Sequence, residues 1–174
     1  MLRNIIEKIS QEFISEAVAS PNLLSDMASM EKYMAESYSG RIFVELLQNA
    51  DDCESKRIIV KEINGNIIFA NDGRPFSRED VIAISRSGSS NKKRGEKIGY
   101  RGIGFKSTTY LTDEILIYSD DTYFTFSKKV CSEKLSMPVN KIPLIRIPIV
   151  VDDIDFQINQ EINEYKDCFI TTFF

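Results

Sequence analysis

The sequence predicts an α+β domain in which amphipathic helices come first and strand hairpins follow. Apolar residues recur at helical spacing from Leu2 to Val18, which is typical of a helix with one buried face. Two hairpins are predicted farther along, over residues 56–70 around Asn64-Gly65 and over residues 114–126 around Asp120-Asp121. Helices that precede a largely antiparallel set of strands indicate the α+β class.

The helices are predicted in order along the first third of the chain. The first covers residues 2–18 and ends before Pro21, the second covers 22–36, and the third covers 41–53 after a break at 37–40. The third helix is apolar around most of its circumference, so we expect it to be largely buried.

The remaining elements follow from local signals. Strands are predicted at 56–62, 66–70, 114–119 and 122–126, and Ser77 is expected to cap a short helix that runs to Ile84. A helix is expected near 104–111, irregular structure at 127–139, a strand-like run at 142–151 with two prolines, and a loop or short helix at 152–167. A last strand is predicted at 168–174.

Composition limits the function classes. The chain has 174 residues, of which 43% are hydrophobic and 28% charged, as in ordinary globular domains. It has no histidine and three widely spaced cysteines, which excludes a histidine base and a zinc site with histidine ligands. No apolar run is long enough to cross a bilayer, and the N-terminus does not resemble a signal peptide. We therefore expect a cytoplasmic protein with free thiols.

Charge and glycine are concentrated in one segment. The net charge is −4, but residues 86–106 hold seven basic residues and one acid, and six of the eight glycines lie between Gly73 and Gly104. Flexibility and positive charge in one place favour a lid over a polyphosphate. The alternative is a basic loop that contacts nucleic acid.

The third helix carries a polar face. Glu45, Asn49 and Asp52 stand at i, i+4 and i+7, so they lie on the same side of the helix. A solvated stripe is the usual explanation of such a pattern. If the helix is buried, however, Asn49 has the oxygen ligand that Mg²⁺ accepts, while the Glu45 carboxylate one turn away could orient a water molecule.

A glycine motif, G-x-x-G-x-G over Gly99, Gly102 and Gly104, precedes the helix expected near 104–111. Glycine allows the backbone to lie directly against a ligand, and the N–H groups at a helix N-terminus bind anions. Arg101 and Lys106 add positive charge, so the motif predicts a phosphate-binding loop. A flexible glycine-rich loop without a ligand is the alternative.

Three motifs now stand in order: Glu45-Leu-Leu-Gln-Asn-Ala-Asp-Asp52, Asn71-Asp-Gly-Arg-Pro-Phe76 and Gly99-Tyr-Arg-Gly-Ile-Gly-Phe-Lys-Ser107. Together they resemble the GHKL ATPase superfamily, and within it the sacsin-like and ninety-kilodalton heat-shock chaperone branch, over roughly residues 35–127. The resemblance implies the Bergerat fold, which is a two-layer α/β sandwich with a mixed, mostly antiparallel sheet, helices on one face and an ATP lid loop.

The resemblance also implies roles for individual residues. Glu45 matches the general base of ATP hydrolysis and Asn49 the ligand of Mg²⁺, in agreement with the helical-face argument. ATP would be the cofactor. The remaining implied nucleotide-binding residues are Asp52, Asn71, Asp72, Gly73, Phe76, Arg86, Ser87, Lys92, Gly99, Tyr100, Arg101, Gly102, Ile103, Gly104, Phe105, Lys106 and Thr172, with Thr171 as an alternative to Thr172.

The base-reading motif departs from the family. The family pattern is D-x-G-x-G, whereas this chain has Asn71 at the aspartate position and Pro75 at the second glycine. The oxygen of an asparagine amide still accepts a hydrogen bond from the amino group of adenine. If the register shifts by one, Asp72 takes that role instead.

These observations predict one ATP-binding domain over residues 1–174, as an N-terminal fragment of a longer protein. Its expected function is slow ATP hydrolysis that drives a conformational change in a chaperone-like or defence-type protein, since lid closure commonly limits such sites. One alternative is a nucleotide-sensing or dimerisation module with little or no hydrolysis, in which the full-length protein forms a homodimer. Another is a nucleic-acid-associated ATPase. The expected partners are ATP and the C-terminal domains of the full-length protein, and no membrane.

Overall fold

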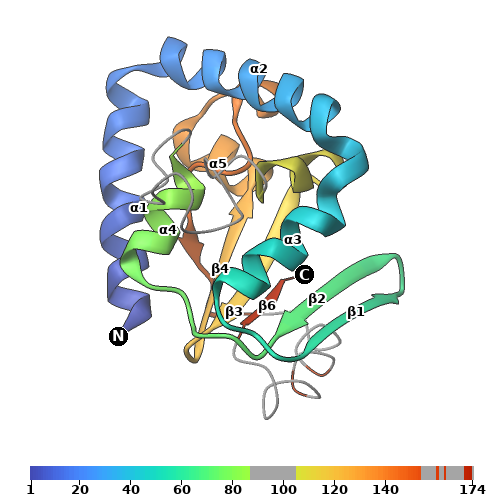
Figure 1. Cartoon of the computed structure of the whole chain (residues 1–174). Helices are drawn as coiled ribbons and strands as arrows, with labels where there is room; N and C mark the ends of the chain where they lie inside the picture. The colour runs from blue at the N-terminus through green and yellow to red at the C-terminus, as the bar shows by residue number, and fades with distance from the viewer. Residues whose placement is uncertain (87–104, 154–159, 161–162, 164–170, 174) are drawn as a thin grey trace.

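The computed structural model describes residues 1–86, 105–153, 160, 163 and 171–173. Two long helices open the chain, α1 (Leu2–Ala19) and α2 (Pro21–Tyr38), followed by the short 3₁₀ helix η1 (Ser39–Arg41) and α3 (Ile42–Asp52). Figure 1 shows α1 along one side of the molecule, α2 across its end, and α3 in front of the strands. The three predicted helices are therefore confirmed.

One six-stranded sheet forms the second layer. Its strands are β1 (Ile58–Ile63), β2 (Asn66–Asn71), β3 (Glu114–Ser119), β4 (Thr122–Ser127), β5 (Ile149–Val150) and β6 (Thr171–Phe173). The order across the sheet is β1-β2-β6-β3-β4-β5, and every pairing between described strands is antiparallel. The sheet was predicted as mixed and mostly antiparallel. The α+β class and the sandwich of helices on a sheet are confirmed.

Both predicted hairpins form around turns that need a left-handed backbone. Asn64 and Gly65 have φ of 53° and 83°, and Asp120 and Asp121 have φ of 47° and 53°. Two consecutive residues with positive φ match the right-handed twist of the flanking strands, which explains why Asn-Gly was a reliable signal.

The core lies between the helices and the sheet. Ile6, Ile9 and Phe13 of α1 are buried together with Phe69, Ile117 and Phe124 of the strands. The short helix α4 (Arg78–Ser85) packs against α1. Ser77 is its N-cap, and the side chains of Ser77 and Asp80 form a reciprocal capping box. Figure 1 shows α4 on the same side of the sheet as α3.

Two sequence predictions are corrected. Residues 128–135 form the helix α5 (Lys128–Leu135), although 127–139 was predicted to be irregular. The run 142–151 was predicted as a strand, but only β5 (Ile149–Val150) pairs, and η3 (Val139–Lys141) precedes it. The helix expected near 104–111 does form, as the 3₁₀ helix η2 (Phe105–Tyr110).

Candidate functional site

Helix α3 presents a polar edge beside its buried face. Ile42, Leu46 and Ala50 are buried, whereas Glu45 and Asn49, one turn apart, are partly exposed. The Glu45 side chain is only 14% exposed, and its Oε1 lies 3.5 Å from Nη2 of Arg41. Because Glu45 is in the first turn, the positive end of the helix dipole also favours its carboxylate.

The prediction that α3 is buried around most of its circumference is wrong. Phe43, Val44 and Leu47 are each almost half exposed, at 46%, 46% and 45%. The helix buries one face only, because it covers the sheet from one side and has solvent on the other. The polar residues therefore lie at the border of the buried face and not on the floor of a closed core.

The turn that follows β2 packs directly on the C-terminal end of α3. The backbone N–H of Arg74 donates to the carbonyl of Cys53, with 3.0 Å between nitrogen and oxygen. A Cβ atom on Gly73 would lie 2.7 Å from the Cys53 oxygen and 2.8 Å from the Cys53 Cβ. This approach requires glycine at position 73, so the second motif packs on Cys53, the residue directly after the first motif.

Asn71 ends β2 and is buried, with 4% of its surface exposed. Its Oδ1 accepts a hydrogen bond from the backbone N–H of Gly73 at 3.1 Å. The Asn71 side chain makes no other hydrogen bond to the residues that the structure describes. This hydrogen bond holds the amide oxygen of Asn71 against the turn that contacts the end of α3.

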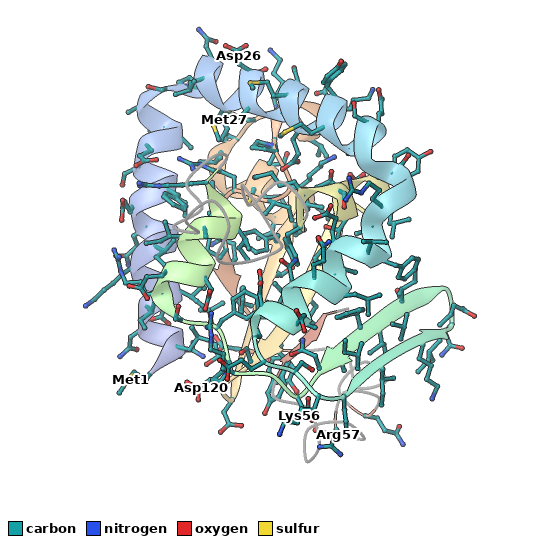
Figure 2. The ribbon with its side chains drawn as sticks, in the orientation of Figure 1. Met1, Asp26, Met27, Lys56, Arg57 and Asp120 are labelled. Carbon is teal, nitrogen blue, oxygen red and sulfur yellow. The ribbon has the colours of Figure 1, made fainter. Side chains whose placement is uncertain are left out.

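Asp72 is occupied by a different set of neighbours. Its Oδ1 accepts from the backbone N–H groups of Lys56 and Arg57, each at 2.8 Å. The same oxygen accepts from the Ser55 hydroxyl at 3.0 Å, and Oδ2 accepts from Nε of Arg57 at 2.8 Å. The hydrogen bonds from Arg57 hold the pKa of this carboxyl well below its usual range. Figure 2 shows Lys56 and Arg57 at the lower end of the molecule.

The strand register places Asn71, Thr171 and Ser119 in one row across the sheet at this end. Asn71 lies opposite Thr171 of β6, and Thr171 lies opposite Ser119 of β3. Thr172, named in the sequence prediction, lies opposite Ala70 and Tyr118 instead. The register therefore brings position 171, and not 172, level with Asn71.

Phe76 closes the turn against this row. Its backbone N–H donates to Oγ of Ser119 at 3.1 Å, and its ring packs edge-on against Phe124 with centroids 6.0 Å apart. Ser119 and Thr122, which pair across the β3–β4 hairpin, are both buried. The side chain of Phe76 therefore fixes the end of the turn to the core.

Lys106, predicted to contact phosphate, is buried in η2 and has protein partners. Its Nζ donates to the carbonyl of Ile145 at 2.7 Å and lies 3.9 Å from Oε2 of Glu31. The Glu31 carboxylate also accepts the backbone N–H groups of Leu144 and Ile145, at 2.5 and 3.0 Å. Burial lowers the pKa of Lys106 to about 8 and raises the pKa of Glu31. Phe105, beside Lys106, is part of the core.

Arg86, also predicted near a phosphate, lies against α1. Its Nη2 donates to Oε1 of Glu12 at 3.0 Å and to Oε1 of Glu16 at 3.4 Å. Its guanidinium carbon is 5.1 Å from the centre of the Phe13 ring, and that of Arg146 is 4.2 Å from the same ring. Arg86 thus belongs to a cluster of charges on α1.

Within the described residues, no group of three or more acidic, cysteine or histidine side chains could hold a metal ion. The Mg²⁺ ligand implied by the resemblance, Asn49, has an amide oxygen on the polar edge of α3.

Several predicted site residues lie outside the part of the chain that the structure describes. They are Ser87, Lys92, Gly99, Tyr100, Arg101, Gly102, Ile103 and Gly104.

The structure adds residues that the sequence analysis did not identify. Arg41 pairs with Glu45, and the i, i+4 spacing on one helix is a signal that could have found it. Ser119 receives the N–H of Phe76, a residue far away in the sequence, and Glu31 receives the N–H groups of 144 and 145. No local pattern points to the last two contacts.

Comparison with known proteins gives a partial match. No protein-family model matches the chain. It is 34% identical over 105 residues to Protein NO VEIN of Arabidopsis thaliana, covering 56% of this chain and 4% of that protein. It is 31% identical over 110 residues to human Sacsin, covering 51% of this chain and 2% of that protein. The likeness to sacsin inferred from the motifs is therefore supported.

The match covers only a small share of both relatives. Because the chain spans 4% and 2% of their lengths, the activities and partners of whole proteins do not transfer with it. In the part of the chain that the structure describes, no helix is both long and apolar enough to cross a membrane.

Proposed function

We propose that residues 1–174 form a GHKL-type module with the Bergerat fold that binds ATP with Mg²⁺ and hydrolyses it slowly. The observation that carries this proposal is the position of α3, which touches both the Asn71–Phe76 turn and η2, the element directly after the glycine motif. One of the three motifs therefore lies on α3, the turn of the second contacts its C-cap residue Cys53, and η2, which contains the end of the third, contacts the helix itself. The similarity to sacsin supports the same conclusion.

The proposed chemistry uses the polar edge of α3. Glu45 would accept a proton from water as the water attacks the γ-phosphate, and Asn49, one turn later, would contribute its amide oxygen to Mg²⁺. Mg²⁺, when bound, supplies charge neutralisation to the phosphates. Asp52 is the last residue of α3 and directly precedes Cys53, whose carbonyl accepts the N–H of Arg74 in the turn that would hold the base. Glu45 suits the role because its carboxylate is mostly shielded but not sealed from solvent, at 14% exposure.

The proposal assigns phosphate contacts to backbone groups of residues 99–104 and not to the ammonium of Lys106. That ammonium is buried and faces Glu31 and the Ile145 carbonyl. Arg86 is paired with Glu12 and Glu16, so it would contact a phosphate only after leaving α1. In this proposal Lys106 and Arg86 stabilise the fold around the site and do not contact the phosphates.

The proposed biological effect of nucleotide binding is a conformational change in a larger protein that contains this domain. We infer that nucleotide binding drives a conformational change in the C-terminal domains of a cytoplasmic, chaperone-like or defence-type protein. A module that senses nucleotide and dimerises without hydrolysis is the second candidate. It is favoured if the nucleotide binds but no phosphate is released.

Calorimetric titration with Mg²⁺ and a non-hydrolysable ATP analogue tests the proposal. Wild type and Glu45→Ala should bind the analogue, whereas Asn49→Ala should lose most of the magnesium-dependent affinity. Asn22→Ala, an exposed asparagine on α2, is the matched control for Asn49→Ala and should bind like wild type.

Phosphate release with ATP then separates binding from chemistry. Wild type and the exposed control Glu36→Ala should release phosphate, while Glu45→Ala should not. Normal hydrolysis by Glu45→Ala would refute the base assignment, and absence of analogue binding by wild type would refute the proposed function as a whole.

A further inference from the structure

The amide orientation of Asn71 is determined by its hydrogen bond with Gly73. A backbone N–H can only donate, so the atom that faces it must be the amide oxygen and not the amino group. The distance between the Gly73 nitrogen and Oδ1 is 3.1 Å. The opposite end of the side chain is therefore the Nδ2 amino group, which has two N–H donors.

That amino group has no hydrogen-bond partner among the residues that the structure describes, although Asn71 is only 4% exposed. Among the described residues, Ser85 Oγ is the one polar side-chain atom that is fully enclosed without a hydrogen-bond partner. Nδ2 of Asn71 is therefore not fully enclosed. A buried amino group that lacks a partner and is not fully enclosed is suited to a ligand acceptor. It lies at the strand end where the proposed function places the base.

We propose that Asn71 allows this position to accept a carbonyl oxygen at carbon 6 of a purine, so that the domain binds 6-oxopurine nucleotides as well as ATP. This inference rests on the proposed function. The Nδ2 group donates to a carbonyl at carbon 6. The second lone pair of Oδ1, which Gly73 does not use, accepts from the amino group of adenine.

An aspartate at the same position would discriminate. An ionised carboxylate has only acceptors, so it accepts from the amino group of adenine and repels a carbonyl oxygen. It would still accept the N–H of Gly73. Asn71→Asp therefore keeps the turn and removes only the two donors, which makes it a precise probe of the amino group. Asp72 does not substitute for it, because its carboxylate already accepts from residues 55–57.

The test compares non-hydrolysable triphosphate analogues of adenosine and inosine, which have identical phosphates and differ at carbon 6 and in the proton on N1. By calorimetry with Mg²⁺, wild type should bind the two within about tenfold of each other. In Asn71→Asp the inosine analogue should weaken by about tenfold or more relative to the adenosine analogue, the typical loss when a buried polar group lacks its partner. Asn22→Asp adds the same charge at an exposed position and should leave the ratio unchanged.

A third analogue makes the test independent of any variant. The purine riboside triphosphate analogue has no group at carbon 6, so wild type should bind it about five- to tenfold more weakly than the inosine analogue. An inosine analogue more than about a hundredfold weaker than the adenosine analogue on wild type would overturn the inference alone. Equal ratios for wild type and folded Asn71→Asp would also overturn it. If wild type binds none of the three, the proposed function fails and this inference fails with it.

Discussion

Replacing Glu31 with glutamine is expected to destabilise the domain by about 3–5 kcal/mol, because it removes one partner of a buried ion pair and leaves the Lys106 amine in the core without its carboxylate. Glu31 is 4% exposed and Lys106 is 2% exposed, so solvent compensates for neither. Each oxygen of the Glu31 carboxylate accepts one N–H, from Leu144 and from Ile145, so glutamine with its single acceptor oxygen also leaves one of these two N–H groups without its acceptor.

A double-mutant cycle separates the pair from its surroundings. Lys106→Met fills similar volume without a charge, and it leaves the Glu31 carboxylate with its two backbone donors. Lys106→Met should therefore lower the free energy of unfolding by less than Glu31→Gln does. In the double variant no unpaired charge remains, so its destabilisation should be about 1–3 kcal/mol smaller than the sum of the single effects.

Urea denaturation at pH 7, followed by circular dichroism, measures the four free energies of unfolding. Glu36→Gln, an exposed glutamate on the same helix, is the control and should change stability by less than about 0.5 kcal/mol. Single effects that add to within about 0.5 kcal/mol would refute the coupling between Glu31 and Lys106 and, with it, the structural role of Lys106.

Two further changes test the turn that follows β2. Gly73→Ala should destabilise the domain by about 1–3 kcal/mol, because the new Cβ would lie 2.7 Å from the Cys53 oxygen; a urea midpoint equal to that of wild type would contradict this packing. Asp72→Asn should destabilise at pH 7. Because the pKa of Asp72 is lowered on folding, its contribution is present above the unfolded pKa of about 4 and is lost as the pH falls below it. The stability gap between wild type and Asp72→Asn should thus narrow at pH 3, and a constant gap would argue against the hydrogen bonds from residues 55–57.

The elements that could be predicted are those whose signals are local. Asn64 and Gly65 both have positive φ, as the hairpin turn requires, and Ser77 caps α4 as expected. The contacts that decide these elements lie within a few residues of one another. The polar edge of α3 was found for the same reason, since its spacing along one helix fixes its side.

The elements that were missed depend on distant partners or on weak patterns. Helix α5 buries only Cys131, so its sequence has no apolar stripe to reveal it. The run 142–147 looked like a strand, but the N–H groups of Leu144 and Ile145 donate to the Glu31 carboxylate and not to a neighbouring strand. A carboxylate more than a hundred residues away in the sequence thus determined the local structure.

The same limitation bears on the charges that suggested a polyphosphate or a nucleic acid. The basic segment 86–106 has seven basic residues, yet Arg86 pairs with Glu12 and Glu16, and Lys106 with Glu31. Their charges are balanced within the fold, so the segment attracts anions less strongly than its composition indicates. The other five basic residues lie outside the described part of the chain. A salt-dependent affinity for nucleic acid would have to come from those five. The nucleotide proposal depends instead on α3, the turn at Asn71 and the backbone groups of residues 99–104, and it needs neither Arg86 nor the Lys106 ammonium.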